Sequence, residues 1–340
     1  MEIRTFRYGL FMILMIIIII EVVLLVPLSP DYENYSSTLT LAPSEYNFVS
    51  MEPAYWLIVY IVQQFFNSQP FALYFIFSIL TFMIASIAYD DSSPYPFFSI
   101  LLFFLLLYPN HGLIQIRQGL ACSIWLYSLK YVVNGDWKKY FLFVSLAVLF
   151  HYSSIILYFI YFIDSKKINK PVYLLMPLVA VLLSYIISLD FLDSVAKILP
   201  FPFNIKLMSY ISSMEIEGQS SRVNRINVVN LVSVTMIALY YISLLMVSVS
   251  KVRKLKEYYI IHVKLLTFAI LSFIALRNLP VLSFRLNVFF QCSIPVIVSF
   301  VISSIVREKE LRVSLFALSL LYFSFLSWNI YIRHELFKIL

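Results

Sequence analysis

Five ionisable side chains lie inside long apolar stretches of the sequence: Glu21, Arg117, His151, Arg277 and Arg285. An ionisable group inside a membrane segment costs about 2.5 kcal/mol or more, so each of them is a candidate for function. Guanidinium groups bind phosphate in a bidentate manner, and a histidine or a carboxylate can take up a proton. These residue types therefore suit the binding of a phosphate group and the transfer of a proton.

Arg117 and His151 are expected in two neighbouring antiparallel segments, 112–133 and 140–163. At 1.5 Å per helical residue they lie roughly 24 and 18 Å from the loop that joins these segments. If the Lys138–Lys139 loop is cytoplasmic, both side chains approach the outer leaflet. The alternative is that Arg117 snorkels or pairs with a buried carboxylate, and that His151 bonds to a backbone carbonyl.

Arg277 and Arg285 bracket a turn, RNLPVLSFR, which we expect on the outer side because the basic KVRKLK cluster at 251–256 precedes the intervening segment. Arg285 then lies about one helical turn inside the next segment, where it can bind phosphate. Anchoring at the membrane interface is the alternative for both arginines. Glu21, in the outer part of the first segment, is expected to pair with an arginine.

The composition predicts an all-α, polytopic membrane bundle to position these residues. Of 340 residues, 61% are hydrophobic and 13% are charged, and the mean hydropathy is +0.89. A soluble domain of this size cannot hide so much apolar surface. The net charge of +7 comes from clusters between apolar runs, which indicates cytoplasmic loops and argues against a nucleic-acid partner.

Known signatures of nucleotide, metal and thiol chemistry are missing from the sequence. It has no Walker A loop, HExxH, GxSxG or CxxC motif. Cys122 and Cys292 have no disulfide or metal spacing, so we assign them to packing. We expect no metal and no cofactor.

The chain is expected to form a single transmembrane domain over residues 1–340, with the N-terminus inside and ten or eleven crossings. The apolar segments are 8–28, 53–67, 71–89, 95–109, 112–133, 140–163, 171–189, 228–250, 258–276, 281–304 and 311–332. The polar stretches 29–52 and 190–227 are expected to be external loops. Segments 53–67 and 95–109 are short for full crossings.

One conflict stays open in this topology. The basic clusters at 138–139 and 166–170 cannot both be cytoplasmic if segment 140–163 crosses the membrane once. Either this segment is a re-entrant hairpin that turns near His151, or one cluster faces outward.

Five short motifs, taken in order, resemble the EpsG family of exopolysaccharide-biosynthesis proteins, which overlaps the Wzy-type O-antigen and capsule polymerases. They are DYENY (31–35), EPAY (52–55), IRQGLA (116–121), LFHYSS (149–154) and FRLNVFF (284–290). The resemblance covers most of the chain and is weakest over 190–227, apart from Lys206 and Tyr210.

The resemblance implies transfer of a growing glycan from undecaprenyl diphosphate to a lipid-linked repeat unit, at the outer face of the bacterial inner membrane. It implies that Arg117, Arg285 and Lys206 stabilise the leaving diphosphate. The implied base is Asp31, with His151 as the alternative or as a supporting partner. The further residues assigned to substrate binding are Tyr35, Glu52 and Tyr210. Three tyrosines, Tyr32, Tyr35 and Tyr55, could stack on sugar rings, and anchoring at the membrane interface explains them equally well. The resemblance also implies a separate chain-length regulator as a partner.

Three alternatives stay open. A flippase for the same lipid-linked unit would need similar arginines, although the 5 glycines, the short chain and the acidic first loop argue against it. An O-antigen ligase or another membrane transferase would share the donor chemistry. A scaffold subunit without enzymatic activity is the third.

Overall fold

The computed structural model is helical, and it contains no strand among the residues it describes, which are 2–187, 189–201, 203–205, 207–209, 211–212, 229–247 and 253–329. This confirms the predicted all-α fold class. By its contacts the chain divides into two compact units, Met1–Phe162 with Val306–Leu340, and Ile163–Ile305.

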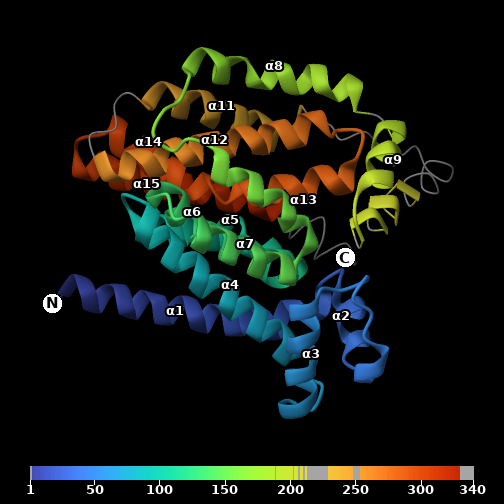
Figure 1. Cartoon of the computed structure of the whole chain (residues 1–340). Coiled ribbons are helices and arrows are strands. Elements are labelled where there is room, and N and C mark those ends of the chain that lie inside the picture. Colours follow the sequence, from blue (N-terminus) through green and yellow to red (C-terminus); the bar gives the residue numbers. More distant parts are fainter. Residues whose placement is uncertain are drawn as a thin grey trace. The chain divides into compact units, whose positions relative to one another are not determined.

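The first unit holds most of the predicted site. Its elements are α1 (Glu2–Leu25), η1 (Val26–Leu28), α2 (Tyr32–Thr38), η2 (Pro43–Glu45), α3 (Pro53–Phe65), α4 (Pro70–Ser92), α5 (Pro96–Leu106), η3 (Pro109–Ile114), α6 (Ile116–Asn134), α7 (Trp137–Phe150), η4 (Tyr152–Phe162) and α15 (Lys309–Ser327). Helix α4 packs against α1, α5 and α6, and α6 packs against α7 (Figure 1).

Local chemistry explains where several of these helices begin and end. Prolines open α3, α4 and α5, at positions where a helix needs no backbone N–H. Helix α6 ends at Gly135, whose φ of 74° lies in the left-handed region that favours glycine. The Asp136 carboxylate then caps α7 by accepting a hydrogen bond from the Lys139 amide at 3.2 Å.

The chain reverses direction at His151, between α7 and η4. The Tyr140 hydroxyl donates to the Leu157 carbonyl at 2.6 Å, and the rings of Phe141 and Tyr158 stack with centroids 5.2 Å apart. The Tyr161 hydroxyl returns to the Gly135 carbonyl at 3.1 Å. Segment 140–163 is therefore a hairpin. A segment that turns back does not cross, so the conflict between the two basic clusters disappears.

Among its described residues, the second unit holds α8 (Lys170–Ile186), α9 (Leu189–Ile198), α11 (Leu231–Met246), α12 (Arg253–Ala275), α13 (Pro280–Gln291) and α14 (Ile294–Ile305). Helix α12 is its centre, because it packs against α8, α11, α13 and α14. Residues 213–227 of the predicted external loop 190–227 lie outside the described residues, and α9 covers its first part.

Among the described residues, four helices are long and apolar enough to cross a membrane, or up to six if each bent pair is one span. The four are Phe11–Leu28, Pro70–Ser92, Leu255–Ala275 and Lys309–Ser327, and the bent pairs are Lys170–Ile186 with Asp190–Ile198 and Leu282–Gln291 with Ile294–Ile305. The protein is thus a multi-pass membrane protein. Continuous spans are fewer than the ten or eleven predicted crossings, because several apolar stretches are broken into shorter helices.

Candidate active site

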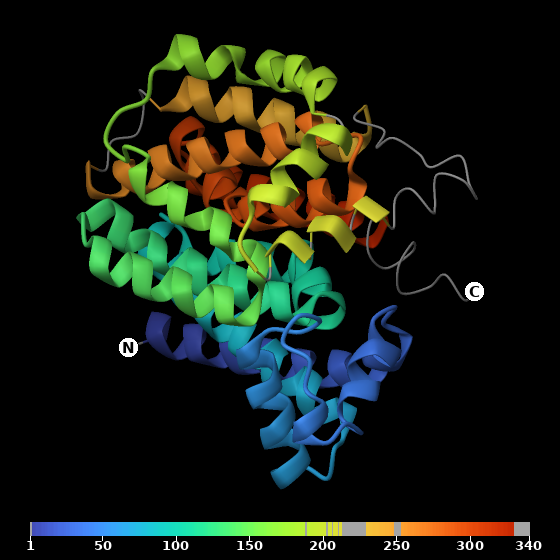
Figure 2. The ribbon, with the colours of Figure 1, turned by 45° about the vertical axis from the view of Figure 1, so that its right-hand side comes forward.

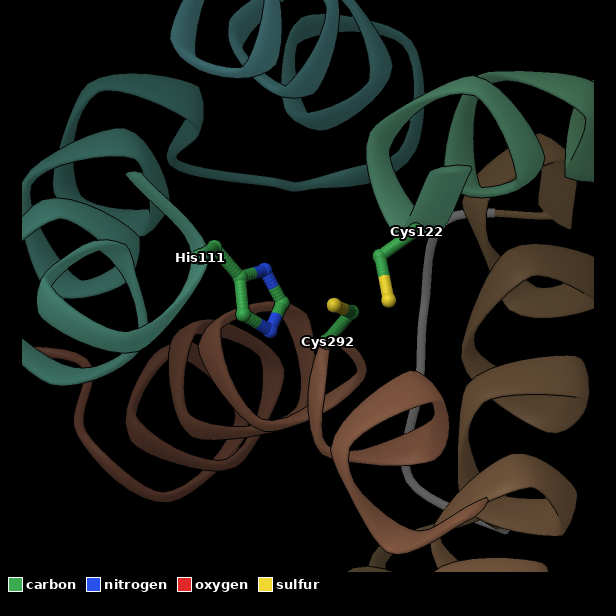
Figure 3. Close-up of side chains that lie close together, drawn as sticks. All are labelled: His111, Cys122 and Cys292. Carbon is green, nitrogen blue, oxygen red and sulfur yellow. The ribbon is translucent and has the colours of Figure 1, made fainter. Parts of the chain in front are cut away.

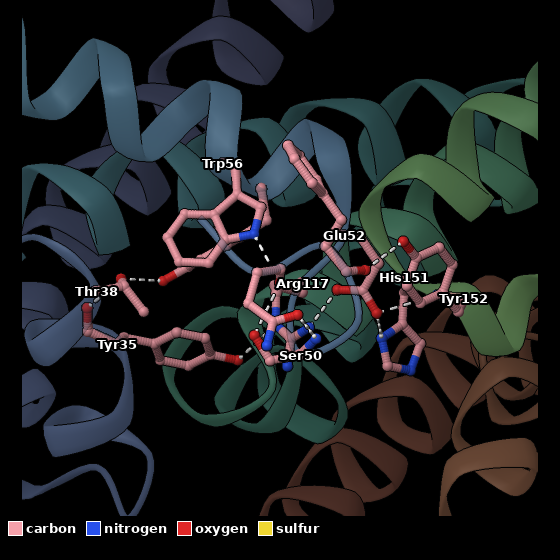
Figure 4. Close-up of polar contacts among 11 residues, drawn as sticks. Tyr35, Thr38, Ser50, Glu52, Trp56, Arg117, His151 and Tyr152 are labelled. Carbon is pink, nitrogen blue, oxygen red and sulfur yellow. Dashed lines mark hydrogen bonds and ion pairs between the residues drawn. The ribbon is translucent and has the colours of Figure 1, made fainter. Parts of the chain in front are cut away.

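The carboxylate of Glu52 is the centre of a buried polar cluster in the first unit (Figure 4). Glu52 precedes Pro53 at the start of α3, and only 1% of the residue is exposed. Its Oε2 forms an ion pair with Nη1 of Arg117. Its Oε1 lies 3.6 Å from Nδ1 of His151 and accepts a hydrogen bond from the Tyr152 amide at 3.2 Å. One carboxylate therefore joins the start of α6 to the turn of the α7–η4 hairpin.

The guanidinium of Arg117 is enclosed by three kinds of partner. Besides its ion pair with Glu52, its Nε donates to the Tyr35 hydroxyl at 3.4 Å. Its Cζ lies 5.7 Å from the ring centroid of Tyr35 and 5.5 Å from that of Tyr55, within the range of a cation–π contact. The side chain is 16% exposed. This set of partners fixes the direction of the guanidinium plane.

Gly119 explains how α6 brings Arg117 to this position. A Cβ at Gly119 would collide with the backbone carbonyl of His111 in η3. Only glycine allows α6 to pack this closely against η3. The glycine of the IRQGLA motif thus serves the placement of the arginine two residues earlier.

Two tyrosines of the cluster are held by Thr38, at the end of α2. The Thr38 hydroxyl donates to the Tyr35 carbonyl at 2.7 Å and lies 2.6 Å from the Tyr55 hydroxyl. Because Thr38 has a single hydroxyl proton, Tyr55 is the donor in the second contact. Both rings are buried and pack against each other.

Burial raises the pKa of the Tyr35 hydroxyl, the Arg117 guanidinium opposes part of this rise, and the Asp31 carboxylate adds to it. Tyr35 is therefore a neutral phenol at physiological pH.

The structure brings four of the predicted site residues together: Tyr35, Glu52, Arg117 and His151. Asp31, the predicted base, lies at the N-terminal end of α2, and its carbonyl accepts a hydrogen bond from the Tyr35 amide at 3.1 Å. It is thus one helical turn away from the cluster's tyrosine.

Arg285 belongs to the second unit, on α13, and is partly buried. Lys206 and Tyr210 lie outside the described residues. Glu21 does not have the arginine partner expected for it: its Oε2 is buried without a hydrogen-bond partner among the described residues.

His111 in η3 and Cys122 in α6 of the first unit lie close together, which no pattern in the sequence predicts. A ring nitrogen of His111 and the Sγ of Cys122 are within 4.8 Å of one another, and both side chains are buried (Figure 3). Two ligands are fewer than the three or four of a protein zinc site. Cys292, drawn in the same figure, belongs to the second unit. The pair alone therefore does not make a metal centre.

The fold and the cluster define a class of protein: a multi-pass helical membrane protein with a carboxylate, a guanidinium and an imidazole joined in one site. The chain belongs to the EpsG family, whose profile matches residues 8–339. Members of this family are similar to Wzy-type polymerases, which supports a polymerase-like role in membrane glycan synthesis. Neither the curated proteins nor the solved structures give a match.

Proposed function

We propose that this protein is a glycosyltransferase that polymerises a surface polysaccharide at the outer face of the bacterial inner membrane. The donor is a glycan on undecaprenyl diphosphate, and the acceptor is a lipid-linked repeat unit. The family relationship supports the class of reaction. The observation that carries the proposal is the Glu52 carboxylate, which links Arg117 with His151. A separate chain-length regulator is part of the proposal.

The reaction needs a leaving-group stabiliser and a base. The acceptor hydroxyl oxygen attacks the anomeric carbon of the donor, and the bond from that carbon to the diphosphate oxygen breaks. The diphosphate leaves with the electron pair, so its charge rises in the transition state, where a fixed guanidinium stabilises it. We assign this part to Arg117, with Arg285 and Lys206 as further proposed contacts.

The hydroxyl proton passes to a base in the same step. Glu52 Oε1 beside Nδ1 supports His151 in this role, because a carboxylate there favours the tautomer with the proton on Nδ1. Nε2 then carries the lone pair that accepts the proton. Asp31, the base that the family resemblance implies, then becomes the alternative. Glu52 is a positioning residue in this scheme, because it orients both Arg117 and His151.

Deletion of the gene, followed by gel analysis of the surface glycan, tests the class of reaction. Loss of a polymerase leaves single repeat units attached, loss of a flippase leaves none, and loss of a ligase leaves free lipid-linked polymer. Only the first pattern agrees with the proposal.

An arginine comparison tests the site. Arg117→Lys keeps the positive charge but loses the planar guanidinium, which can form two parallel hydrogen bonds to a phosphate. We therefore expect short glycan chains. The matched control is Arg312→Lys in the same unit, because Arg312 donates to the carbonyls of Val306 and Arg307 at 2.8 and 2.9 Å. The control should keep full-length chains. Full-length chains from an Arg117→Ala protein that inserts normally would remove Arg117 from the mechanism.

A further inference from the structure

We infer that α3 does not cross the membrane and instead lies in the outer leaflet of the bilayer, with its exposed apolar face in contact with lipid. The partner surface is the lipid itself. This inference depends on α3 and its neighbours in the first unit and not on the proposed reaction.

The two faces of α3 differ in exposure, and both are mainly apolar, with the exposed Gln64 near the C-terminal end as an exception. One face is buried and includes Tyr55, Trp56 and Val59. On the other face Leu57 is 60% exposed and Tyr60 is 44% exposed. No charged residue occurs between positions 53 and 69. A helix that faced water would carry polar or charged groups on its exposed side, so this composition fits an apolar surrounding.

The exposed apolar surface continues from α3 onto a membrane helix. The turn after α3 exposes Phe65 at 77% and reverses through Asn67 and Ser68, which have φ values of 49° and 55°. Helix α4 begins two residues later and is one of the four candidate spans. Phe71, in its first turn, is also exposed, at 39%. The end of α3 is therefore at the level where α4 enters the membrane.

Length and direction both argue against a crossing. Thirteen residues of α-helix span about 20 Å, whereas the hydrocarbon core is about 30 Å thick. Both views of the ribbon show α3 running crosswise to α1, which is a candidate span of the same unit (Figures 1 and 2). A helix crosswise to a spanning helix lies along the membrane plane.

The order of crossings leads to the same result. With the N-terminus inside, the candidate spans α1 and α4 bring the chain back to the inside, and the Lys138–Lys139 loop is then cytoplasmic if α5 with η3 and α6 together cross an even number of times. A crossing by α3 would place this basic loop outside, against the positive-inside rule. Glu52, at the N-terminal end of α3, then lies at the outer interface, which is the level of a lipid head group.

Spin labels on single cysteines test this placement in vesicles of phosphatidylethanolamine and phosphatidylglycerol. Tyr60→Cys and Phe65→Cys report on α3, Leu80→Cys in the middle of α4 reports on the hydrocarbon core, and Ser44→Cys reports on the exposed loop. The two native cysteines are buried, so the unmodified chain is the labelling blank. Power saturation compares collisions with oxygen, which enters lipid, and with a water-soluble nickel complex.

We expect the labels at 60 and 65 to favour oxygen, at a depth between those of positions 44 and 80. Three results would overturn the inference. Nickel access equal to that at position 44 would mean that α3 faces water. Protection from both reagents would mean that a second copy or another protein covers it, and a depth equal to that at position 80 would mean that α3 crosses. None of these outcomes depends on glycan synthesis, so the two proposals can fail separately.

Discussion

The two units bind their buried cations with different kinds of partner. In the first unit, Arg117 meets the carboxylate of Glu52, which also lies beside His151. In the second unit, Lys264 is 5% exposed, and its Nζ donates to the backbone carbonyls of Asp164 and Lys167, each at 2.6 Å. Burial of a charge alone does not separate these two cases.

The kind of partner separates them. A backbone carbonyl is neutral and fixed by the fold, so Lys264 connects α12 to a loop and has a structural role. A carboxylate can exchange protons and partners, so the Arg117 cluster can respond to a substrate. The two histidines differ in the same way, because Nδ1 of His262 lies 3.1 Å from the Ser293 hydroxyl, a neutral partner. Four predictions test this distinction.

The largest effect is expected for Glu52→Ala. This change leaves the Arg117 guanidinium buried without its anion, which costs about 3–5 kcal/mol of folding free energy. It also removes the group that orients His151, so we expect loss of chain elongation. Thermal unfolding of the purified protein and the length of the surface glycan measure the two effects.

Glu33→Ala is the matched control for Glu52→Ala, because Glu33 is an exposed carboxylate on α2 of the same unit. It should change neither measurement. If Glu52→Ala unfolds at the same temperature as the unmodified protein, the ion pair does not hold the cluster together.

The second prediction compares the two histidines. His151→Gln removes the proposed base, and general-base catalysis contributes about 10²–10⁴-fold to a rate. We expect a fall of this order in the rate of transfer with lipid-linked substrates in vesicles. His262→Gln keeps a polar group beside Ser293, so the folded protein should keep its rate.

Unfolding temperatures of both histidine variants show whether a loss of rate is only a loss of folded protein. An unchanged rate for His151→Gln would assign the proton transfer to another group. Asp31→Asn is then the variant to measure.

The third prediction concerns the second unit alone. Lys264→Met removes two hydrogen bonds from a charged donor to buried carbonyls, and we expect a loss of about 1–3 kcal/mol in stability. The protein that remains folded should keep its rate. Lys197→Met is the control, because Lys197 pairs with Asp193 at an exposed position of α9. A fall in the rate of folded Lys264→Met would contradict a purely structural role.

The sequence predicts much of this fold because apolar length dominates it. The stretches 8–28 and 71–89 correspond to α1 and α4, since their composition permits little else in a membrane. Counting residues from a shared loop also placed Arg117 and His151 at a similar depth. Both side chains indeed reach the same carboxylate.

The sequence does not determine the hairpin or the carboxylate at its turn. No proline or glycine marks the break at His151, which lies inside the long, mainly apolar stretch 140–163. The contacts that close the hairpin, such as that from Tyr140 to Leu157, join side chains and carbonyls that no local pattern relates. Glu52 meets Arg117 across 65 positions of sequence, beyond the reach of helical periodicity.

The smallest effect is expected for Tyr55→Phe, which separates the ring of this tyrosine from its hydroxyl. The ring stays beside the Arg117 guanidinium, so the cation–π contact is kept. Among the described residues the lost hydroxyl is hydrogen-bonded to Thr38, and Thr38 keeps its bond to the Tyr35 carbonyl. We therefore expect a loss of about 1 kcal/mol in stability and little change in the rate.

Tyr240→Phe is the counterpart in the second unit, because the Tyr240 hydroxyl donates to the Tyr173 carbonyl. Equal small losses of stability in both variants, with unchanged rates, would show that the hydroxyls are structural in both units. The difference between the units would then lie in their charged groups alone. A large fall in rate for Tyr55→Phe would extend the reactive cluster beyond Arg117 to the Tyr55–Thr38 pair, and Thr38→Val would be expected to reproduce it.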